Sequence, residues 1–111
     1  MTTPVLAFTE TRSGDRVELA VVGEVDLATK DSLVGVATRV VKEGPALLVL
    51  NLAGVPFIDS TGLSSLIKIR RVCDEAGCVL ELSNLQDRVV MLLCLTGLGS
   101  YLNAVEPEVG V

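Results

Sequence analysis

The spacing of the hydrophobic positions predicts a chain in which strands and helices alternate. Two apolar segments, residues 5–9 and 17–22, predict strands, and the sequence RSGDR between them is typical of a turn. Hydrophobic residues then recur at the helical spacing i, i+3, i+4 and i+7, at Leu33, Val36, Ala37 and Val40. Thr29 or Asp26 can cap this predicted helix, because a side-chain oxygen there can accept a hydrogen bond from a free backbone N–H.

The second half of the chain continues this alternation. Its predicted elements are a strand over residues 46–52, a helix over 61–76, a strand over 78–82, a helix within 83–99 and a last short element from residue 101. Gly44 and Pro45 precede the first of these strands, and Gly77, then Gly97 or Gly99, end the helices. The nearly continuous apolar run of the first strand is typical of a central strand covered on both faces. This order predicts an α/β sheet with parallel pairs and helices packed on it.

The two later helices carry more apolar residues than one buried stripe requires. Polar side chains form a single narrow side of the helix over residues 61–76, at Ser64, Lys68, Arg71 and Glu75. We expect a neighbouring helix to cover most of the rest, with a partner protein as the alternative. The sequence VVMLLCL, residues 89–95, predicts a helix packed on two sides, with a second interface as the alternative.

Length and composition bound the architecture. The chain has 111 residues, which suits one compact domain, and we expect residues 1–111 to form it. Half of the residues are hydrophobic, yet there is no Trp, one Tyr and two Phe. We therefore expect an aliphatic core of Val, Leu, Ile and Ala.

The formal net charge of −5 disfavours two classes of partner. A negative surface gains nothing from meeting a polyanion, so we expect no nucleic-acid binding and no attachment to an anionic membrane. The longest apolar stretch is much shorter than the about 20 residues that a bilayer-spanning helix needs. The N-terminal sequence MTTPVLAFTE has no basic region and no long apolar segment. We expect a cytoplasmic location and no membrane insertion.

The absence of histidine and the setting of the cysteines limit the chemistry. Without His the chain has no Ser-His-Asp triad, no Cys-His pair and few ways to bind zinc. Cys73, Cys78 and Cys94 lie in apolar sequence and form no C-x-x-C pair, so we expect buried, reduced thiols. We expect no catalytic residue, no metal site and no cofactor.

The sequence FIDSTGL, residues 57–63, is the most informative segment. It joins a buried strand to a helix, which is where α/β folds place functional groups. Asp59 or Ser60 as N-cap would satisfy a free backbone N–H and lie favourably against the positive end of the helix dipole. Capping explains one of these residues but does not require the whole sequence Asp-Ser-Thr-Gly.

Three known motifs fit this segment poorly. The phosphate-binding motif G-x-x-x-x-G-K-[ST] is absent from the sequence. The nucleophile elbow G-x-S-x-G would have Ile58 in place of its first Gly, and its base is missing. The Asp-Thr-Gly or Asp-Ser-Gly motif of aspartic proteases requires a Gly one residue before Gly62, and those proteases are almost entirely β.

Phosphorylation is a simpler use of a hydroxyl at this position. A phosphate on Ser60 would add roughly −1.5 to −2 charge. The N-terminus of its own helix would accept this anion, because the dipole and free N–H groups face it. A partner packed tightly over Ser60 and Asp59 would meet added bulk, charge and a desolvation penalty. The segment therefore predicts a switch that releases a bound partner.

The chain resembles the STAS domain family in its bacterial anti-sigma factor antagonist form. The resemblance rests on GEVDLAT at residues 23–29, LLVLNLAGVPFIDSTGLSSL at 47–66 and TGL at 96–98. It implies a four- to five-stranded mixed β-sheet with helices packed mainly on one face. It also implies a regulatory protein rather than an enzyme, which binds an anti-sigma factor serine kinase of the histidine-kinase-like ATPase fold and so frees a sigma factor. Phosphorylation would release the kinase, and a serine phosphatase would reset the protein.

Matched by position, the resemblance implies that Ser60 is the phosphorylation site, with Thr61 less favoured. The partner-binding residues that it implies are Glu24, Asp26, Asp59, Ser60, Thr61, Gly62 and Leu63. For Glu24 and Asp26, a structural role as turn formers or helix caps explains the residues as well as partner contact does. The alternative function is a STAS scaffold or nucleotide-sensing module, for example in a lipid-transport complex, in which the loop hydroxyl is a contact residue without a phospho-switch.

Overall fold

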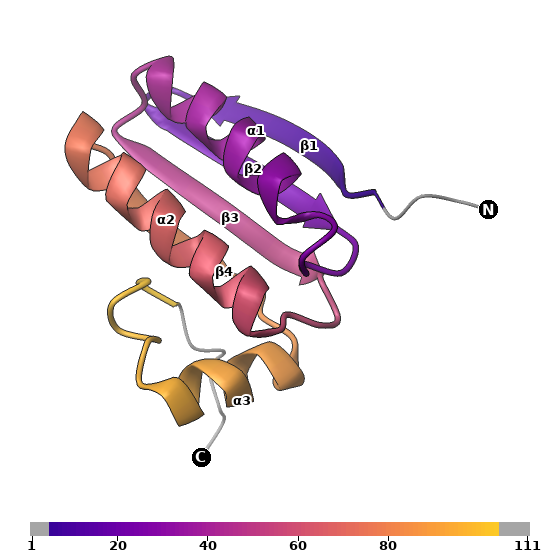
Figure 1. Ribbon diagram of the computed structural model, residues 1–111. Coiled ribbons are helices and arrows are strands. Elements are labelled where there is room, and N and C mark those ends of the chain that lie inside the picture. The colour runs from indigo at the N-terminus through magenta and orange to yellow at the C-terminus, as the bar shows by residue number, and fades with distance from the viewer. Residues whose placement is uncertain (1–4, 105–111) are drawn as a thin grey trace.

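The computed structural model describes residues 5–104, which form four strands and three helices (Figure 1). In chain order the elements are β1 (Ala7–Ser13), β2 (Arg16–Val22), α1 (Lys30–Lys42), β3 (Leu47–Gly54), α2 (Ser60–Ala76), β4 (Val79–Ser83) and α3 (Asp87–Thr96). The predicted order of strands and helices is confirmed through α3.

The first hairpin is tighter than the sequence predicts. β1 continues to Ser13, which pairs with Arg16, so only Gly14 and Asp15 form the turn. Gly14 has φ of +59°, a conformation that glycine adopts without steric penalty. The predicted turn RSGDR was too wide, because its outer residues belong to the strand ladder.

The four strands form one mixed sheet in the order β1-β2-β3-β4. β1 is antiparallel to β2, whereas β2, β3 and β4 are parallel, as the alternation with helices predicts. The short element predicted from residue 101 is represented by a single parallel bridge between Ala104 and Leu82. The remainder of that predicted element lies outside the described residues.

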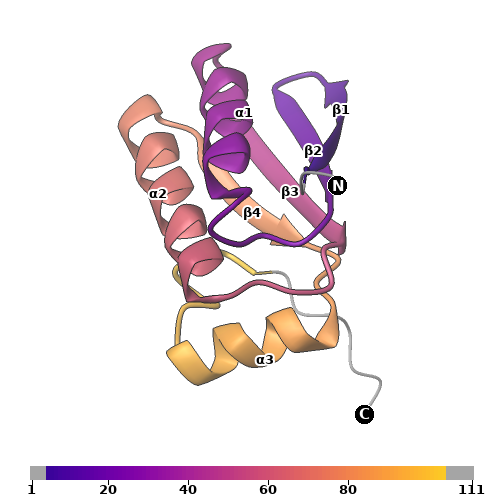
Figure 2. The same ribbon diagram turned by 45° about the vertical axis from the view of Figure 1, so that its right-hand side comes forward.

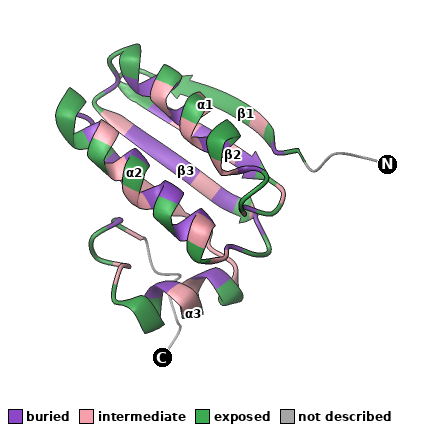
Figure 3. Cartoon of the chain, viewed as in Figure 1, coloured by how far each residue is buried: buried purple, intermediate pink, exposed green. Residues whose placement is uncertain are grey.

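Helices α1 and α2 lie side by side on one face of the sheet (Figures 1 and 2). The buried strand residues that alternate toward this layer are Val17, Leu19 and Val21 of β2, Leu48, Leu50 and Leu52 of β3, and Leu80 and Leu82 of β4. Buried residues concentrate between the helices and the sheet (Figure 3). The predicted aliphatic core and the predicted neighbouring helix beside α2 are both confirmed.

The second face of the sheet corrects one prediction. Within residues 5–104 no helix covers it, so β3 is not covered by helices on both faces. Val49 points to this face and is nevertheless buried, with Glu18 and Glu81 as its register partners on the two neighbouring strands. The apolar run of β3 reflects its central place in the sheet rather than a second helical layer.

Helix α3 lies across the end of the sheet, beneath the N-terminal end of α2 (Figures 1 and 2). Val89 and Leu93 are buried, but Met91 is 63% exposed and Leu95 is 80% exposed. The prediction of a helix packed on two sides is therefore wrong. α3 has one buried side, and its other side is apolar and open within the described part of the chain.

The cysteines divide into two environments. Cys73 and Cys78 are buried free thiols, as predicted, whereas Cys94, on α3, is exposed. Burial, with a contribution from neighbouring Cys78, raises the pKa of Cys73 to about 12. At neutral pH this thiol is therefore protonated and is a poor nucleophile.

A cluster of ion pairs joins β1 to the C-terminal end of α1. Arg12 and Arg39 both pair with Glu10 and with Glu43, including an Arg39–Glu43 distance of 3.0 Å. The hydrogen bond from Arg39 is the largest influence on the pKa of Glu10, which lies below its ordinary value of 4.5. This network fixes the outermost strand to the helix layer.

Leu50→Ala should destabilise the protein by about 2–5 kcal/mol, because Leu50 is fully buried in the central strand and its loss leaves a cavity. Leu95→Ala is the control, and it should change the unfolding free energy by less than about 0.5 kcal/mol because that side chain is exposed. Urea unfolding measures both. Equal effects of the two substitutions would contradict the described core.

Glu10→Gln should lower stability at neutral pH by at most about 1 kcal/mol, since the ion pairs of Glu10 are largely solvent-accessible. The folded protein has the lower pKa, so ionised Glu10 stabilises it above pH 4.5, and this contribution disappears as the pH falls through the folded pKa. The difference in unfolding free energy between the variant and wild type should vanish below the folded pKa of Glu10, and it should shrink in high salt. Glu75→Gln, outside the network, is the control, and a difference that persists in acid would refute the assignment.

Candidate functional site

Two loops meet at the carboxyl end of the sheet, where residues 23–29 connect β2 to α1 and residues 55–59 connect β3 to α2 (Figures 1 and 2). Val25 and Ile58 form a parallel bridge between them. The Val25 N–H donates to the Phe57 carbonyl at 3.1 Å, and the Asp59 N–H donates to the Val25 carbonyl at 3.4 Å. Backbone hydrogen bonds therefore hold the two loops together as one surface.

Asp59 is the N-cap of α2. Its carboxylate Oδ1 accepts a hydrogen bond from the Gly62 N–H at 2.8 Å, and its carbonyl accepts the Leu63 N–H at 2.9 Å. Asp59 satisfies N–H groups that the first turn of a helix otherwise leaves free. The capping role that the sequence offered to Asp59 or Ser60 belongs to Asp59, so Ser60 is not needed for it.

Ser60 is the first residue of α2, and it is exposed. Its carbonyl accepts a hydrogen bond from Ser64 Oγ at 3.1 Å, whereas no hydrogen bond of its own hydroxyl occurs among residues 5–104. Thr61 is half-buried and lines a groove between α1 and α2. Of the two neighbouring hydroxyls, that of Ser60 is the more accessible to another protein.

Gly62 allows α2 to start directly against the other loop. A Cβ at this position would lie 2.4 Å from the Val25 carbonyl oxygen and 2.9 Å from the side chains of Val25 and Ile58. No side chain fits that space without movement of the backbone. The sequence identified Gly62 as part of a motif, but the reason for it is a contact between segments far apart in the chain.

Asp26 and Thr29 shape the first loop. Asp26 Oδ1 accepts hydrogen bonds from the N–H groups of Ala28 and Thr29, at 2.9 and 3.2 Å. Thr29 occupies the N-cap position of α1 but makes no side-chain cap, and its hydroxyl donates instead to the Glu24 carbonyl at 2.7 Å. Asp26 thus acts as a turn former, while the Glu24 side chain is exposed at the surface.

Leu63 corrects the predicted set of partner contacts. It is only 6% exposed and belongs to the hydrophobic core, so it supports the loop from beneath and offers little surface to a partner. Gly62 is buried as well. Among the predicted partner-binding residues, Glu24 and Ser60 are exposed and Asp26, Asp59 and Thr61 are partly so.

A groove of about 230 Å³ runs beside this surface between the N-terminal halves of α1 and α2. Lys30 and Lys68 line it together with Asp31, Thr61 and Ser64, and Lys30 Nζ lies 3.4 Å from Asp31 Oδ1. Arg70, on the same helix α2, is engaged elsewhere: it pairs with Asp74 at 2.9 Å and lies 4.9 Å from the centre of the Tyr101 ring. The charged residues of the groove are therefore two lysines and one aspartate.

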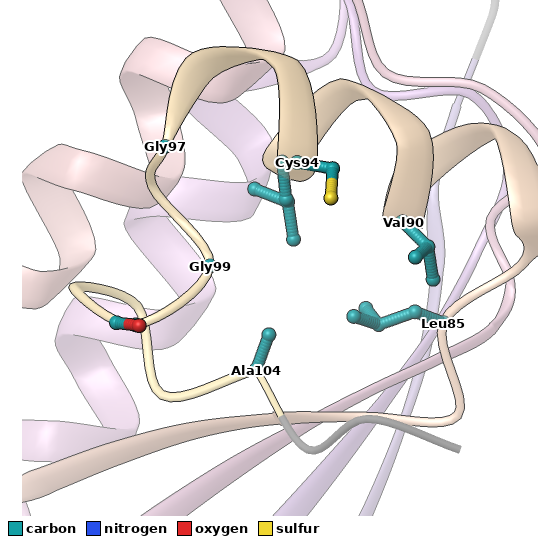
Figure 4. Close-up of a pocket in the computed structure, with 8 residues that line it drawn as sticks. Leu85, Val90, Cys94, Gly97, Gly99 and Ala104 are labelled. Carbon is teal, nitrogen blue, oxygen red and sulfur yellow. The ribbon is translucent and has the colours of Figure 1, made fainter. Parts of the chain in front are cut away.

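A second cavity lies at α3, and none of the residues that line it belongs to the two loops. It has a volume of about 330 Å³ and is formed by α3 and the segments on either side, with Leu85, Val90, Cys94, Gly97 and Ala104 around it (Figure 4). None of its lining residues is charged. No chemical signal in the sequence points to this cavity, because uncharged residues, mostly apolar side chains and glycines, line it.

Two further findings concern metal binding and membrane-spanning helices in the described region. Within residues 5–104 no three His, Cys, Asp or Glu side chains are grouped so that they could hold a metal ion. No helix in this part of the chain has the length and apolar character needed to cross a bilayer.

Comparison with known proteins gives consistent results. A family model of the STAS domain matches residues 8–110. The anti-sigma-B factor antagonist of Staphylococcus aureus is 30% identical over 98 residues, which span 87% of this chain and 91% of the relative.

Solved structures show the same fold. An anti-sigma factor antagonist from Mycobacterium paratuberculosis aligns with a TM-score of 0.78 at 23% identity, covering 93% of this chain and 87% of that one. The Bacillus protein SpoIIAA, an anti-sigma factor antagonist in its unphosphorylated form, aligns with a TM-score of 0.72 at 19% identity, covering 92% and 90%. At these identities the likeness concerns the fold alone.

Gly62→Ala should destabilise the protein by about 1–3 kcal/mol, because the new methyl group would overlap the Val25 carbonyl. Amide NMR signals of residues 24–26 should shift as that loop is displaced. Gly35→Ala in α1 is the matched control: its Cβ meets nothing within 4 Å, and alanine should stabilise the helix by up to about 1 kcal/mol. If both substitutions behaved alike, the close approach at Gly62 would not constrain the loops.

Proposed function

The chain belongs to the STAS domain family, in its bacterial anti-sigma factor antagonist form, and from this premise we propose that it acts as an anti-sigma factor antagonist. In this proposal the unphosphorylated protein binds an anti-sigma factor serine kinase of the histidine-kinase-like ATPase fold, and a sigma factor is thereby freed. Phosphorylation on Ser60 releases the kinase, and a serine phosphatase removes the phosphate. The exchange takes place in the cytoplasm and changes transcription.

The exposed hydroxyl of Ser60 is the observation that carries the proposal. Ser60 is the first residue of α2, and the N-cap of this helix is Asp59. A kinase can therefore reach Ser60 Oγ without breaking a hydrogen bond that holds the helix start. Thr61 is less accessible, because its side chain faces the groove between α1 and α2.

The transfer itself requires little from this chain. Ser60 Oγ attacks the γ-phosphorus of ATP on the kinase, a new O–P bond forms, and the bond to the β–γ bridging oxygen breaks to leave ADP. The hydroxyl proton passes to a base of the kinase. The role of this protein is to present the acceptor oxygen on a rigid helix start.

The phosphate acts differently on the two molecules. In this chain it lies at the positive end of the α2 dipole, where an anion is favourable, so the fold is retained. In the complex it occupies space that the kinase had filled, and it brings roughly −1.5 to −2 charge into a desolvated interface. Each 1.4 kcal/mol of lost binding energy weakens the complex about tenfold.

Incubation with a cognate kinase and ATP should place a single phosphate on Ser60, as mass spectrometry of the peptide containing residues 57–66 would show. Ser60→Asp should weaken kinase binding at least about tenfold in calorimetry, because it places a charge at the interface. Ser60→Ala should bind like wild type and resist release by ATP. Thr61→Ala is the matched control for the acceptor: it should still be phosphorylated on Ser60 and released by ATP.

Two outcomes would argue against this function. If Ser60→Asp binds the kinase as tightly as wild type, phosphorylation cannot be the release signal. If no phosphate is transferred and wild type binds no such kinase, the loop hydroxyl is a contact residue, as in a STAS scaffold or nucleotide-sensing module.

A further inference from the structure

Two large apolar side chains stand exposed on the same pair of loops as Ser60. Leu27, in the β2–α1 loop, is 71% exposed, and Phe57, in the β3–α2 loop, is 40% exposed. Burial of apolar surface is favourable by about 25 cal/mol per Å², so a partner that covers Ser60 gains binding energy if it also covers these two side chains.

Neither side chain is needed to fill the core beneath the loops. That task falls to the neighbouring residues Val25, Val55 and Ile58, which are buried. Leu27 and Phe57 point outward although buried apolar neighbours lie one or two residues away in the chain. Their exposure is a property of the loop geometry and not of a poorly packed end of the molecule.

Both exposed residues are carried on backbone that hydrogen bonds hold in place. The Phe57 carbonyl accepts the Val25 N–H at 3.1 Å, which links the two loops. Leu27 lies within the turn that Asp26 closes, where Oδ1 accepts the Ala28 N–H at 2.9 Å. A surface already fixed before binding loses little conformational entropy when a partner covers it.

We propose that Leu27 and Phe57 are the apolar anchors by which the partner kinase holds the unphosphorylated protein, and that the kinase carries a matching apolar surface beside its nucleotide site. This inference rests on the proposed function, because Ser60 must enter the kinase site and the two loops enter with it. Affinity and regulation are then separate properties of one surface: the anchors hold the kinase, and the Ser60 phosphate opposes them. Aromatic and aliphatic residues at the centre of an interface commonly dominate its binding energy.

The experiment uses the full chain with each purified anti-sigma factor kinase encoded in the same genome. Wild type is tested first, and the kinase that it binds is kept. Leu27→Ala and Phe57→Ala should each weaken binding at least about tenfold, and the double variant should weaken it further. Leu95→Ala removes an exposed apolar side chain on α3; it is the matched control for Leu27→Ala and should bind within about twofold of wild type.

Two measurements separate an anchor from a change in folding or charge. Urea unfolding of Leu27→Ala should match wild type, because that side chain is mostly exposed; it keeps the test valid if Phe57→Ala proves unstable. The wild-type affinity should change little between about 50 and 300 mM NaCl, because apolar contacts are not screened by salt. Glu24→Gln should alter the association rate and its salt dependence more than the affinity.

Each of the other possible results contradicts the anchors, the choice of partner or the proposed function. If wild type binds a kinase and both loop variants bind it equally well, the anchors are refuted while the proposed function stands. If Leu95→Ala weakens binding instead, α3 is the docking surface. If wild type self-associates in analytical ultracentrifugation and Leu27→Ala abolishes it, the surface joins two copies of this chain. If wild type binds no kinase, the proposed function and this inference both fail.

Discussion

The contact between Val25 and the start of α2 is the constraint on which the site depends. The bridge to Ile58 and the hydrogen bonds to Phe57 and Asp59 align the two loops, and Gly62 brings the helix backbone directly against the Val25 carbonyl. These contacts are made by backbone atoms, which have little freedom to adjust. A partner therefore meets one preformed surface, although its residues come from two distant parts of the sequence.

Within this surface the carboxylates and the hydroxyl have separate tasks. Asp26 and Asp59 each bind backbone N–H groups and hold a turn or a helix start. Ser60 and Glu24 remain exposed beside them. This division allows a covalent change at Ser60 without loss of the hydrogen bonds that shape the loop. It also explains why Asp-Ser-Thr-Gly needs more residues than a simple cap.

The sequence predicted what depends on local order and missed what depends on distant contacts. The helical spacing of hydrophobic residues identified the helices, and the polar Asp-Ser pair at the start of a helix identified the exposed hydroxyl. The spacing of hydrophobic positions could not show that Leu95 and Cys94 of α3 are exposed, because it does not indicate which side of a helix the fold covers. Leu63 follows an exposed motif but turns inward, since the helix rotates by about 100° per residue.

The two edges of the sheet oppose the addition of another strand in different ways. At the β4 edge, Asn103 accepts the Leu82 N–H through its carbonyl and donates its Nδ2 to the Leu80 carbonyl at 2.8 Å. At the β1 edge, Glu10 and Arg12 are tied by ion pairs to α1, and charged side chains discourage pairing between strands of different molecules. A chain with half its residues hydrophobic is thereby protected against edge-to-edge aggregation, and association is directed to its loops and helices.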